Sequence, residues 1–296
     1  MHEVRILDVD SPLAEPFLAY VRAYGAQHDD SHIAPEDLAR FDPGIEPAVI
    51  ALDEGQSVVG AASLMLEGFS DEGSARFRIL HALYPEHYPA LVDAVLARVP
   101  SSVDRVFLLL PEHAGDIQDS LGLIGFGVCR RAYVLRHRDP RSAVHVDYPS
   151  ETHVQLAAAA VAGDWAAVVN SAFHGHPGHV EMTYDRAGEL LSCPRVLHEG
   201  TLIAYKSGVS AGVVLTMVDA SDAGAAAIEM LAVTSGNQGI GIGRALLHDA
   251  VSAAGRCGCR WVTLSVSTFS RRAVAMYLDS GFRAEDIRVC WERMRA

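Results

Sequence analysis

The sequence predicts an α/β (α+β) fold that is used twice in tandem. Patterns typical of short strands alternate with patterns typical of amphipathic helices along all 296 residues. The order of these elements repeats after a central segment, and Gly125-Phe126 and Gly281-Phe282 stand at equivalent places 156 residues apart. A chain of this length can bury two separate cores. We therefore expect a first domain at 1–139, a linker at 140–151 and a second domain at 152–296.

The first half combines alternating apolar runs with amphipathic segments. The turn 53–55, Asp-Glu-Gly, separates two apolar runs and predicts a hairpin. We expect strands at 4–9, 48–52, 58–65, 76–83, 105–110 and 128–136, and helices at 13–24, 88–98 and 116–121.

The segment that follows, from Asp139 to Pro149, has two prolines and mixed polarity, which favours a linker. Beyond it the same order of patterns returns, and Ala211-Gly212 parallels Val59-Gly60 of the first half. We expect strands at 154–156, 201–205, 210–217, 228–233 and 261–266, and helices at 164–172, 244–254 and 271–279.

Residues 228–244 are the stretch most indicative of chemistry. Strand alternation places the carboxylate of Glu229 on one pleat with Leu231 and Val233, which are apolar and leave that charge unexplained. The glycines that follow permit positive φ and a close backbone approach, and a helix start directs free N–H groups at the same place. These glycines are Gly239, Gly241 and Gly243. The stretch therefore predicts a site for phosphate oxygens.

Two known phosphate-binding motifs do not fit this turn. The dinucleotide fingerprint requires a glycine where Arg244 stands, and the lysine of a Walker loop is absent. The corresponding loop of the first half, 82–90, has two prolines and no glycine. Because proline lacks an N–H donor and forbids positive φ, we expect only the second half to hold a pyrophosphate in this way.

Composition limits the classes of partner. A net charge of −13, from 24 basic and 37 acidic residues, argues against binding of nucleic acid or an anionic membrane over the whole surface. No apolar run approaches the length of about 20 residues that spans a bilayer, and no signal peptide is evident, so we expect a cytoplasmic protein. The pair Cys257 and Cys259 has no second pair, which favours buried thiols over a structural zinc site; no metal is expected.

Two motifs in the second half resemble those of one family. Val233, Gln238 and the three glycines match the pattern V-x-x-x-x-(Q/R)-G-x-G-x-G, and 270–282 resembles N-x-x-A-x-x-x-Y-x-x-x-G-F. Both patterns are typical of the GCN5-related N-acetyltransferase (GNAT) superfamily. The resemblance implies two tandem GNAT-like domains, each with a mixed, mostly antiparallel sheet flanked by helices. The first would be degenerate and the second catalytic.

The resemblance also implies acetyl-CoA as co-substrate. Its pyrophosphate would be held by Gln238, Gly239, Ile240, Gly241, Ile242, Gly243 and Arg244. Its pantetheine arm would lie along the backbone of Leu231, Ala232 and Val233, where the next strand of the family splays away. Ser270 stands where the family usually has asparagine, and its shorter hydroxyl keeps one hydrogen bond.

Two side chains are candidates for acid and base chemistry. The resemblance implies that Tyr277 protonates the departing thiolate, which a hydroxyl with a pKa of about 10 can do at neutral pH; the alternative is simple packing on a helix. Glu229 stands four residues before Val233, where several relatives carry a carboxylate. It would accept a proton or contact substrate, and the alternative is a solvated charge.

The loop 173–179 contains three histidines where the acceptor-binding helices of the family lie. The alternatives for this loop are acceptor recognition, a surface turn and a metal site, and its irregular glycine and proline spacing disfavours metal. Residues 170–178 also resemble a segment of mycothiol synthase, a tandem acetyltransferase.

These observations predict an N-acetyltransferase (acyltransferase, EC 2.3.1 class) that acetylates a primary amine of a small molecule by direct attack in a ternary complex. The alternative is a non-catalytic acyl-CoA-binding or regulatory protein. Because the two halves form a pseudo-dimer, either a monomer or a homodimer is expected.

Overall fold

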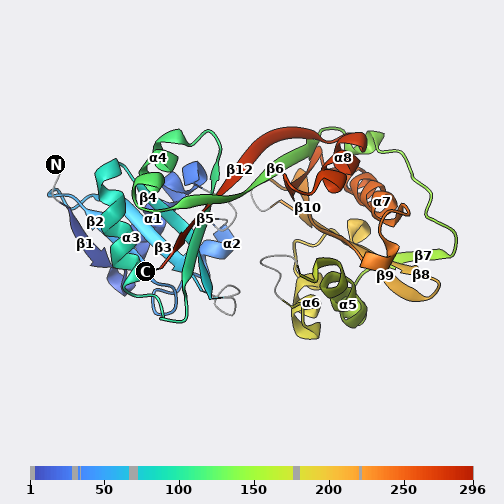
Figure 1. Cartoon of the computed structure of the whole chain (residues 1–296), viewed down its shortest axis with the longest axis horizontal. Coiled ribbons are helices and arrows are strands. Elements are labelled where there is room, and N and C mark those ends of the chain that lie inside the picture. The colour runs from blue at the N-terminus through green and yellow to red at the C-terminus, as the bar shows by residue number, and fades with distance from the viewer. Residues whose placement is uncertain are drawn as a thin grey trace. The chain divides into compact units, whose positions relative to one another are not determined.

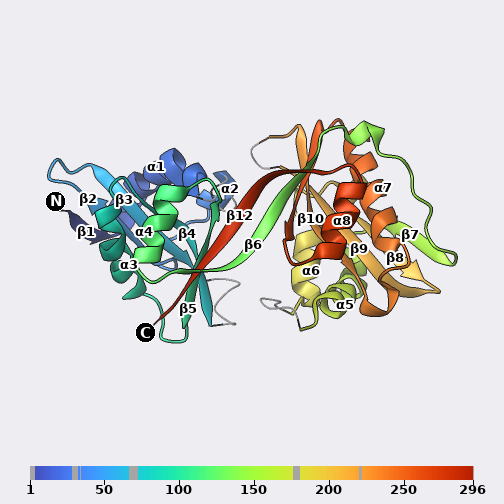
Figure 2. The same ribbon diagram turned by 45° about the horizontal axis from the view of Figure 1, so that its top comes forward.

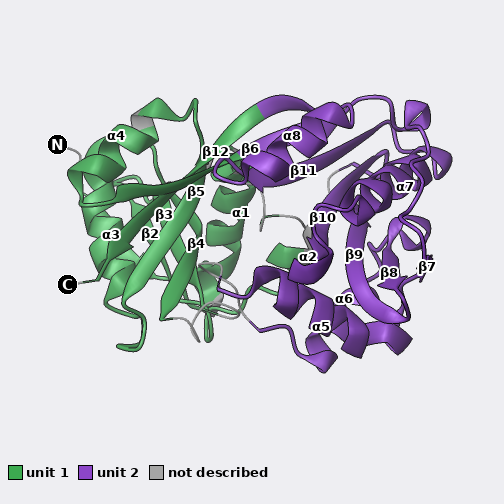
Figure 3. Cartoon of the chain, turned by 45° about the vertical axis from the view of Figure 1, so that its right-hand side comes forward, with its two compact units in different colours: residues 1–132, 286–296 green, residues 133–285 purple. Residues whose placement is uncertain are grey.

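The computed structural model describes residues 4–28, 33, 35–66, 73–175, 181–219 and 222–295. The chain divides into two compact units, shown in green and purple in Figure 3. Unit 1 comprises residues 1–132 together with 286–296, and unit 2 comprises residues 133–285.

Unit 1 is a sheet covered on both faces by helices (Figure 1). Neighbouring residues of β2 alternate between the faces, so that Ile50 packs with the α1 cluster, whereas Val49 and Ala51 pack with the α3 cluster. β4 and β5 pair in parallel, and the other pairs among β1 to β5 are antiparallel. The elements are β1 (Arg5–Asp8), α1 (Ser11–His28), α2 (Pro35–Leu38), β2 (Ala48–Leu52), β3 (Val58–Met65), β4 (Ser74–Ala82), α3 (Tyr88–Leu96), β5 (Arg105–Pro111), α4 (Gly115–Leu123) and β6 (Gly127–His137).

Unit 2 repeats this plan (Figure 2). α5 and α6 cover one face of its sheet, and α7 and α8 belong to the cluster on the other face. β10 and β11 pair in parallel, whereas β7 to β10 are antiparallel, so the predicted mixed, mostly antiparallel sheet is confirmed. The elements are β7 (Thr152–Leu156), α5 (Ala162–Phe173), α6 (Tyr184–Leu191), β8 (Leu202–Lys206), β9 (Val209–Val218), β10 (Ala225–Val233), α7 (Ile242–Arg256), β11 (Trp261–Ser267) and α8 (Arg271–Asp279). The boundary between the units falls within β6 and within the last strand, β12 (Arg283–Met294), whose residues from 286 onward belong to unit 1.

Glycines at equivalent places support the predicted repeat. A Cβ on Gly60 would lie 2.9 Å from Leu91 of α3, and a Cβ on Gly212 would lie 2.9 Å from Ile242 of α7. In each unit, therefore, a helix crosses a strand at a glycine because no side chain fits between them. Gly125 and Gly281 likewise both have positive φ, at 86° and 93°.

The last strand, β12, was not predicted from the sequence. Its residues 288–294 pair antiparallel with β5 of unit 1, from Arg288 opposite Pro111 to Met294 opposite Arg105. The compact units therefore differ from the predicted boundaries, because 286–296 group with unit 1 and 133–139 with unit 2. The sequence of β12 alternates poorly and is rich in charge, which obscures the period of a strand.

Two short helices, α2 and α6, also escaped prediction. α6 has only eight residues, and its start depends on Thr183, whose hydroxyl accepts a hydrogen bond from the Arg186 amide at 3.2 Å. Across the described part of the chain, no helix combines the length and the apolar character needed to cross a membrane.

Candidate functional site

The two central strands of unit 2 separate midway along their length. β10 pairs with β11 only from Ala225 to Ile228, whereas its pairing with β9 continues to Val233. The second half of β10 therefore faces an opening in the sheet instead of a neighbouring strand. This is the place where the resemblance implied that the strands splay.

A β-bulge at Glu229 lies at the start of this opening. The register with β9 shifts between Ile228 and Met230, and the bulge breaks the simple alternation expected from the sequence. Ile228 packs in the α7 cluster, as do Leu231 and Val233, whereas Met230 packs in the α5 cluster. Glu229 thus does not share a regular pleat with Leu231 and Val233, because a bulge inserts one extra residue and interrupts the alternation of side chains between the two faces of the sheet.

The Glu229 side chain is exposed, yet its carboxyl is less well hydrated than a free one. Loss of water around it raises the pKa of Glu229, the charge of Asp219 acts in the same direction, and Arg195 opposes both. A raised pKa suits a carboxylate that takes a proton from an ammonium.

The glycine turn after β10 leads directly into α7. Gly239 and Gly241 have φ of 80° and 108°, and Gly241 is the N-cap residue. Gly243, in contrast, lies within the first turn of the helix, where a Cβ would be 3.3 Å from Val233. The helix begins two residues earlier than predicted, so Gly243 lies within it and permits close packing against Val233 without adopting a positive φ.

The first amides of α7 are available for a ligand, since the first turn of a helix has no internal acceptors for them and Gly241 offers no side-chain cap. The Ile242 side chain is fully buried, so only its backbone can contribute. Gln238 donates from Nε2 to the Val233 carbonyl at 3.0 Å. Arg244 pairs with Asp279 at 3.5 Å, an exposed ion pair that an anion could displace.

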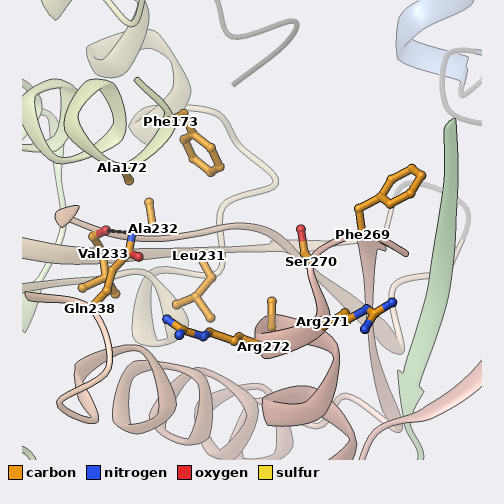
Figure 4. A pocket seen from close by; sticks show the side chains of 11 residues that line it. Ala172, Phe173, Leu231, Ala232, Val233, Gln238, Phe269, Ser270, Arg271 and Arg272 are labelled. Atoms are coloured by element: carbon orange, nitrogen blue, oxygen red, sulfur yellow. Dashed lines mark hydrogen bonds between the residues drawn. The ribbon is translucent and has the colours of Figure 1, made fainter. Parts of the chain in front are cut away.

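An open groove of about 480 Å³ lies along the second half of β10 (Figure 4). Five of the predicted site residues line it: Leu231, Ala232, Val233, Gln238 and Ser270. The other predicted residues do not line it, namely Glu229, Gly239 to Arg244, and Tyr277.

Six further residues line the groove and were not among the predicted site residues, although Phe173 begins the loop 173–179 and Ala273 belongs to the motif 270–282: Ala172, Phe173, Phe269, Arg271, Arg272 and Ala273. In Figure 4 the Arg272 side chain extends toward Gln238 and Val233, whereas Arg271 extends in the opposite direction. The sequence feature that could have pointed to this part of the groove is the pair of adjacent arginines after Ser270, in a chain with few basic residues. Of the predicted histidine loop 173–179, residues 176–179 lie outside the described residues.

Tyr277 is buried in the core of unit 2. Its ring meets that of Phe282 edge-on, with centroids 6.0 Å apart, and burial raises the pKa of its hydroxyl to about 12. No hydrogen bond to this hydroxyl is found within the described residues. Both roles considered for Tyr277, proton donor and packing residue, therefore stay open, because the ring packs in the core and the hydroxyl is protonated at neutral pH.

Unit 1 has the same framework with different side chains. β4 pairs with β5 only as far as Arg76, and its register with β3 shifts around Arg78, the equivalent of Glu229. Arg78 is buried and donates to both carboxylate oxygens of Glu46 at 2.7 Å. Leu121 occupies the position of Tyr277, because it accepts from the Phe126 amide as Tyr277 does from Phe282.

Solved structures share this architecture across nearly the whole chain. A GCN5-related N-acetyltransferase from Sphaerobacter thermophilus has a TM-score of 0.73 at 19% identity, covering 98% of this chain and 95% of that one. A tandem GNAT protein from the clavulanic acid biosynthesis pathway has the same TM-score at 14% identity, covering 99% and 98%. The chain therefore has the fold of tandem GNAT proteins.

The match to a family model is more specific. Residues 165–282, which lie within unit 2, match the model of the Acetyltransferase (GNAT) family, in agreement with the resemblance seen in the motifs of this segment. No curated protein sequence matches the chain, and the likeness to mycothiol synthase stays a prediction.

Proposed function

We propose that the chain is an acetyl-CoA-dependent N-acetyltransferase that acts on a primary amine of a small molecule, with its active site in unit 2. The observation that carries this proposal is the separation of β10 from β11 directly before a glycine-capped helix. Such a separation leaves room for an extended ligand along β10, and the helix start supplies donors for its phosphates.

The residues present fit acetyl-CoA. The amides of the turn from Gly239 to Arg244 would hold the pyrophosphate, with Arg272 as a cation directed at the same end of the groove. The backbone of Leu231 to Val233 would pair with the pantetheine arm, and one of its N–H groups would polarise the thioester carbonyl. When bound, the co-substrate supplies an activated acetyl group.

In the proposed reaction a C–N bond forms as the amine attacks the thioester carbon, and the C–S bond breaks. Glu229 accepts the proton that the substrate ammonium must lose, directly or through water. Tyr277 donates a proton to the departing sulfur. General acid and base steps of this kind typically contribute 10²- to 10⁴-fold each.

We assign no catalysis to unit 1. Arg78 replaces the proposed base, Leu121 replaces the proposed acid, and the loop 82–90 carries prolines where unit 2 has its glycines. A buried arginine paired with Glu46 cannot accept a proton at neutral pH.

Acetyl-CoA binding to a Gly241→Ala variant tests the proposal. Gly241 has φ of 108°, so alanine there strains the turn by about 1–3 kcal/mol, and we expect the Kd from calorimetry to rise about tenfold or more. Gly208→Ala is the matched control, since Gly208 has φ of 81° in the turn between β8 and β9. A wild-type protein without acetyl-CoA binding would overturn the proposal.

A second candidate is a non-catalytic acyl-CoA-binding protein. It is favoured by the absence of Tyr277 from the groove lining and by serine at position 270. Tight acetyl-CoA binding without transfer to any amine of a broad panel would establish it.

A further inference from the structure

The groove carries aromatic side chains on both sides of its opening. Phe173 comes from the end of α5 and Phe269 from the turn before α8. In Figure 4 the two rings flank the opening, with the Ser270 hydroxyl between them. Phe269 is 80% exposed. Covering an exposed aromatic ring with an apolar group removes apolar surface from water and is therefore favourable.

The charge of the groove is positive, although the chain as a whole is acidic. Its described lining contains Arg271 and Arg272 and neither aspartate nor glutamate. No ion pair of either arginine is found within the described residues. Arg272 is the side chain assigned to the phosphates of acetyl-CoA, whereas Arg271 extends in the opposite direction in Figure 4, so a ligand with several positive charges would be repelled by the Arg271 guanidinium.

The charges around the proposed base match a single ammonium. The groups that act on the Glu229 carboxyl are Asp219 and Arg195. The Glu229 carboxylate is complementary to one ammonium, and the groove lining offers no further carboxylate for a second amine of the same molecule.

From these observations we infer that the acceptor is a primary monoamine with an apolar body, an arylalkyl or alkyl amine. This inference rests on the proposed function and narrows its substrate class. The amine would extend beyond the groove lining to Glu229, two residues before Leu231 on β10, and the apolar body would lie between Phe173 and Phe269.

Steady-state kinetics with three amines test the inference. We expect kcat/KM for 2-phenylethylamine to exceed that for spermidine, a polycation, and that for glucosamine, a polar amine, by at least tenfold. Equal or better use of spermidine or glucosamine would overturn the inference while leaving the proposed acetyl transfer intact.

Binding provides a measurement that does not depend on turnover. Calorimetry on the CoA-loaded protein should show 2-phenylethylamine binding that weakens at least fivefold in Phe269→Ala, which alters only an exposed side chain, and in Phe173→Ala. Leu156→Ala on β7, also an exposed apolar residue, is the matched control and should bind normally. Unchanged binding in both phenylalanine variants would overturn the inference, whereas loss of acetyl-CoA binding by the wild type would overturn the proposed function.

Discussion

At equivalent bulges the two units carry opposite charges, Glu229 in unit 2 and Arg78 in unit 1. A bulge points its extra residue away from the regular ladder, which suits a group that meets a ligand. In unit 1 the Arg78 side chain instead forms a buried ion pair with Glu46. One side chain at each bulge thus decides whether that position can take part in proton transfer.

Tyr277→Phe tests the proposed acid. The ring and its contact with Phe282 remain, so we expect an unchanged melting temperature and acetyl-CoA Kd, with kcat lowered about 100-fold because the departing thiolate loses its proton donor. Stopped assays of acetyl transfer and thermal unfolding provide both measurements. Normal turnover would leave Tyr277 with a packing role alone.

The raised pKa of Glu229 predicts a pH dependence. A base must be deprotonated, so activity should rise with pH through the pKa of this carboxyl, and that rise should lie above the ordinary value of about 4.3 for glutamate. The pH profile of kcat/KM measures it. Glu229→Gln should lower the rate and remove this part of the profile; a variant with the wild-type profile would show that another group accepts the proton.

At the scale of elements, the crossing of β9 and α7 positions the phosphate site. Gly212→Ala would place a Cβ 2.9 Å from Ile242 and 3.0 Å from Leu246 at the start of the helix. Such overpacking typically costs about 1–3 kcal/mol. We expect a lower free energy of unfolding in urea and weaker acetyl-CoA binding.

A compensating change separates packing from other causes. Ile242→Ala removes the Cγ2 methyl group that meets the new Cβ, so Gly212→Ala should lower the free energy of unfolding less in an Ile242→Ala background than in the wild type. Gly236→Ala, where a Cβ would meet nothing within 4 Å, should be nearly neutral. Equal losses in Gly212→Ala and Gly236→Ala would contradict the crossing as the cause.

The sequence predicted regular elements well and irregular ones poorly. β2, β3 and α8 have the predicted bounds because their periodicity is clear and their ends carry turn residues. The bulge at Glu229 depends on pairing with β9, which no local pattern encodes. Likewise, Phe173 lines the groove only because α5 packs against β10, so that part of the site needs tertiary structure.

At the scale of the whole molecule, unit 1 is discontinuous in sequence. Val289 and Cys290 of β12 are almost fully buried, and seven residues of this strand pair with β5. Burying side chains of this kind contributes about 1.5–3 kcal/mol each. Unit 1 thus depends on residues that follow all of unit 2 in the chain.

Deleting residues 288–296 from the full chain tests this dependence. Without β12, the amides of β5 lose their neighbouring strand, so hydrogen exchange measured by mass spectrometry should quicken in Arg105–Pro111. Exchange in β9, within unit 2, should change little and provides the internal control. Unchanged exchange in β5 would show that unit 1 is complete without the strand.

The same discontinuity sets an order for folding during synthesis. A ribosome releases unit 2 almost entirely before it releases residues 288–294, which complete the sheet of unit 1. The strand edge of β5 is therefore left unpaired while more than 150 further residues are translated, which takes about 10–30 s at typical rates of synthesis. During that time the nascent first half exposes an apolar edge that chaperones can bind.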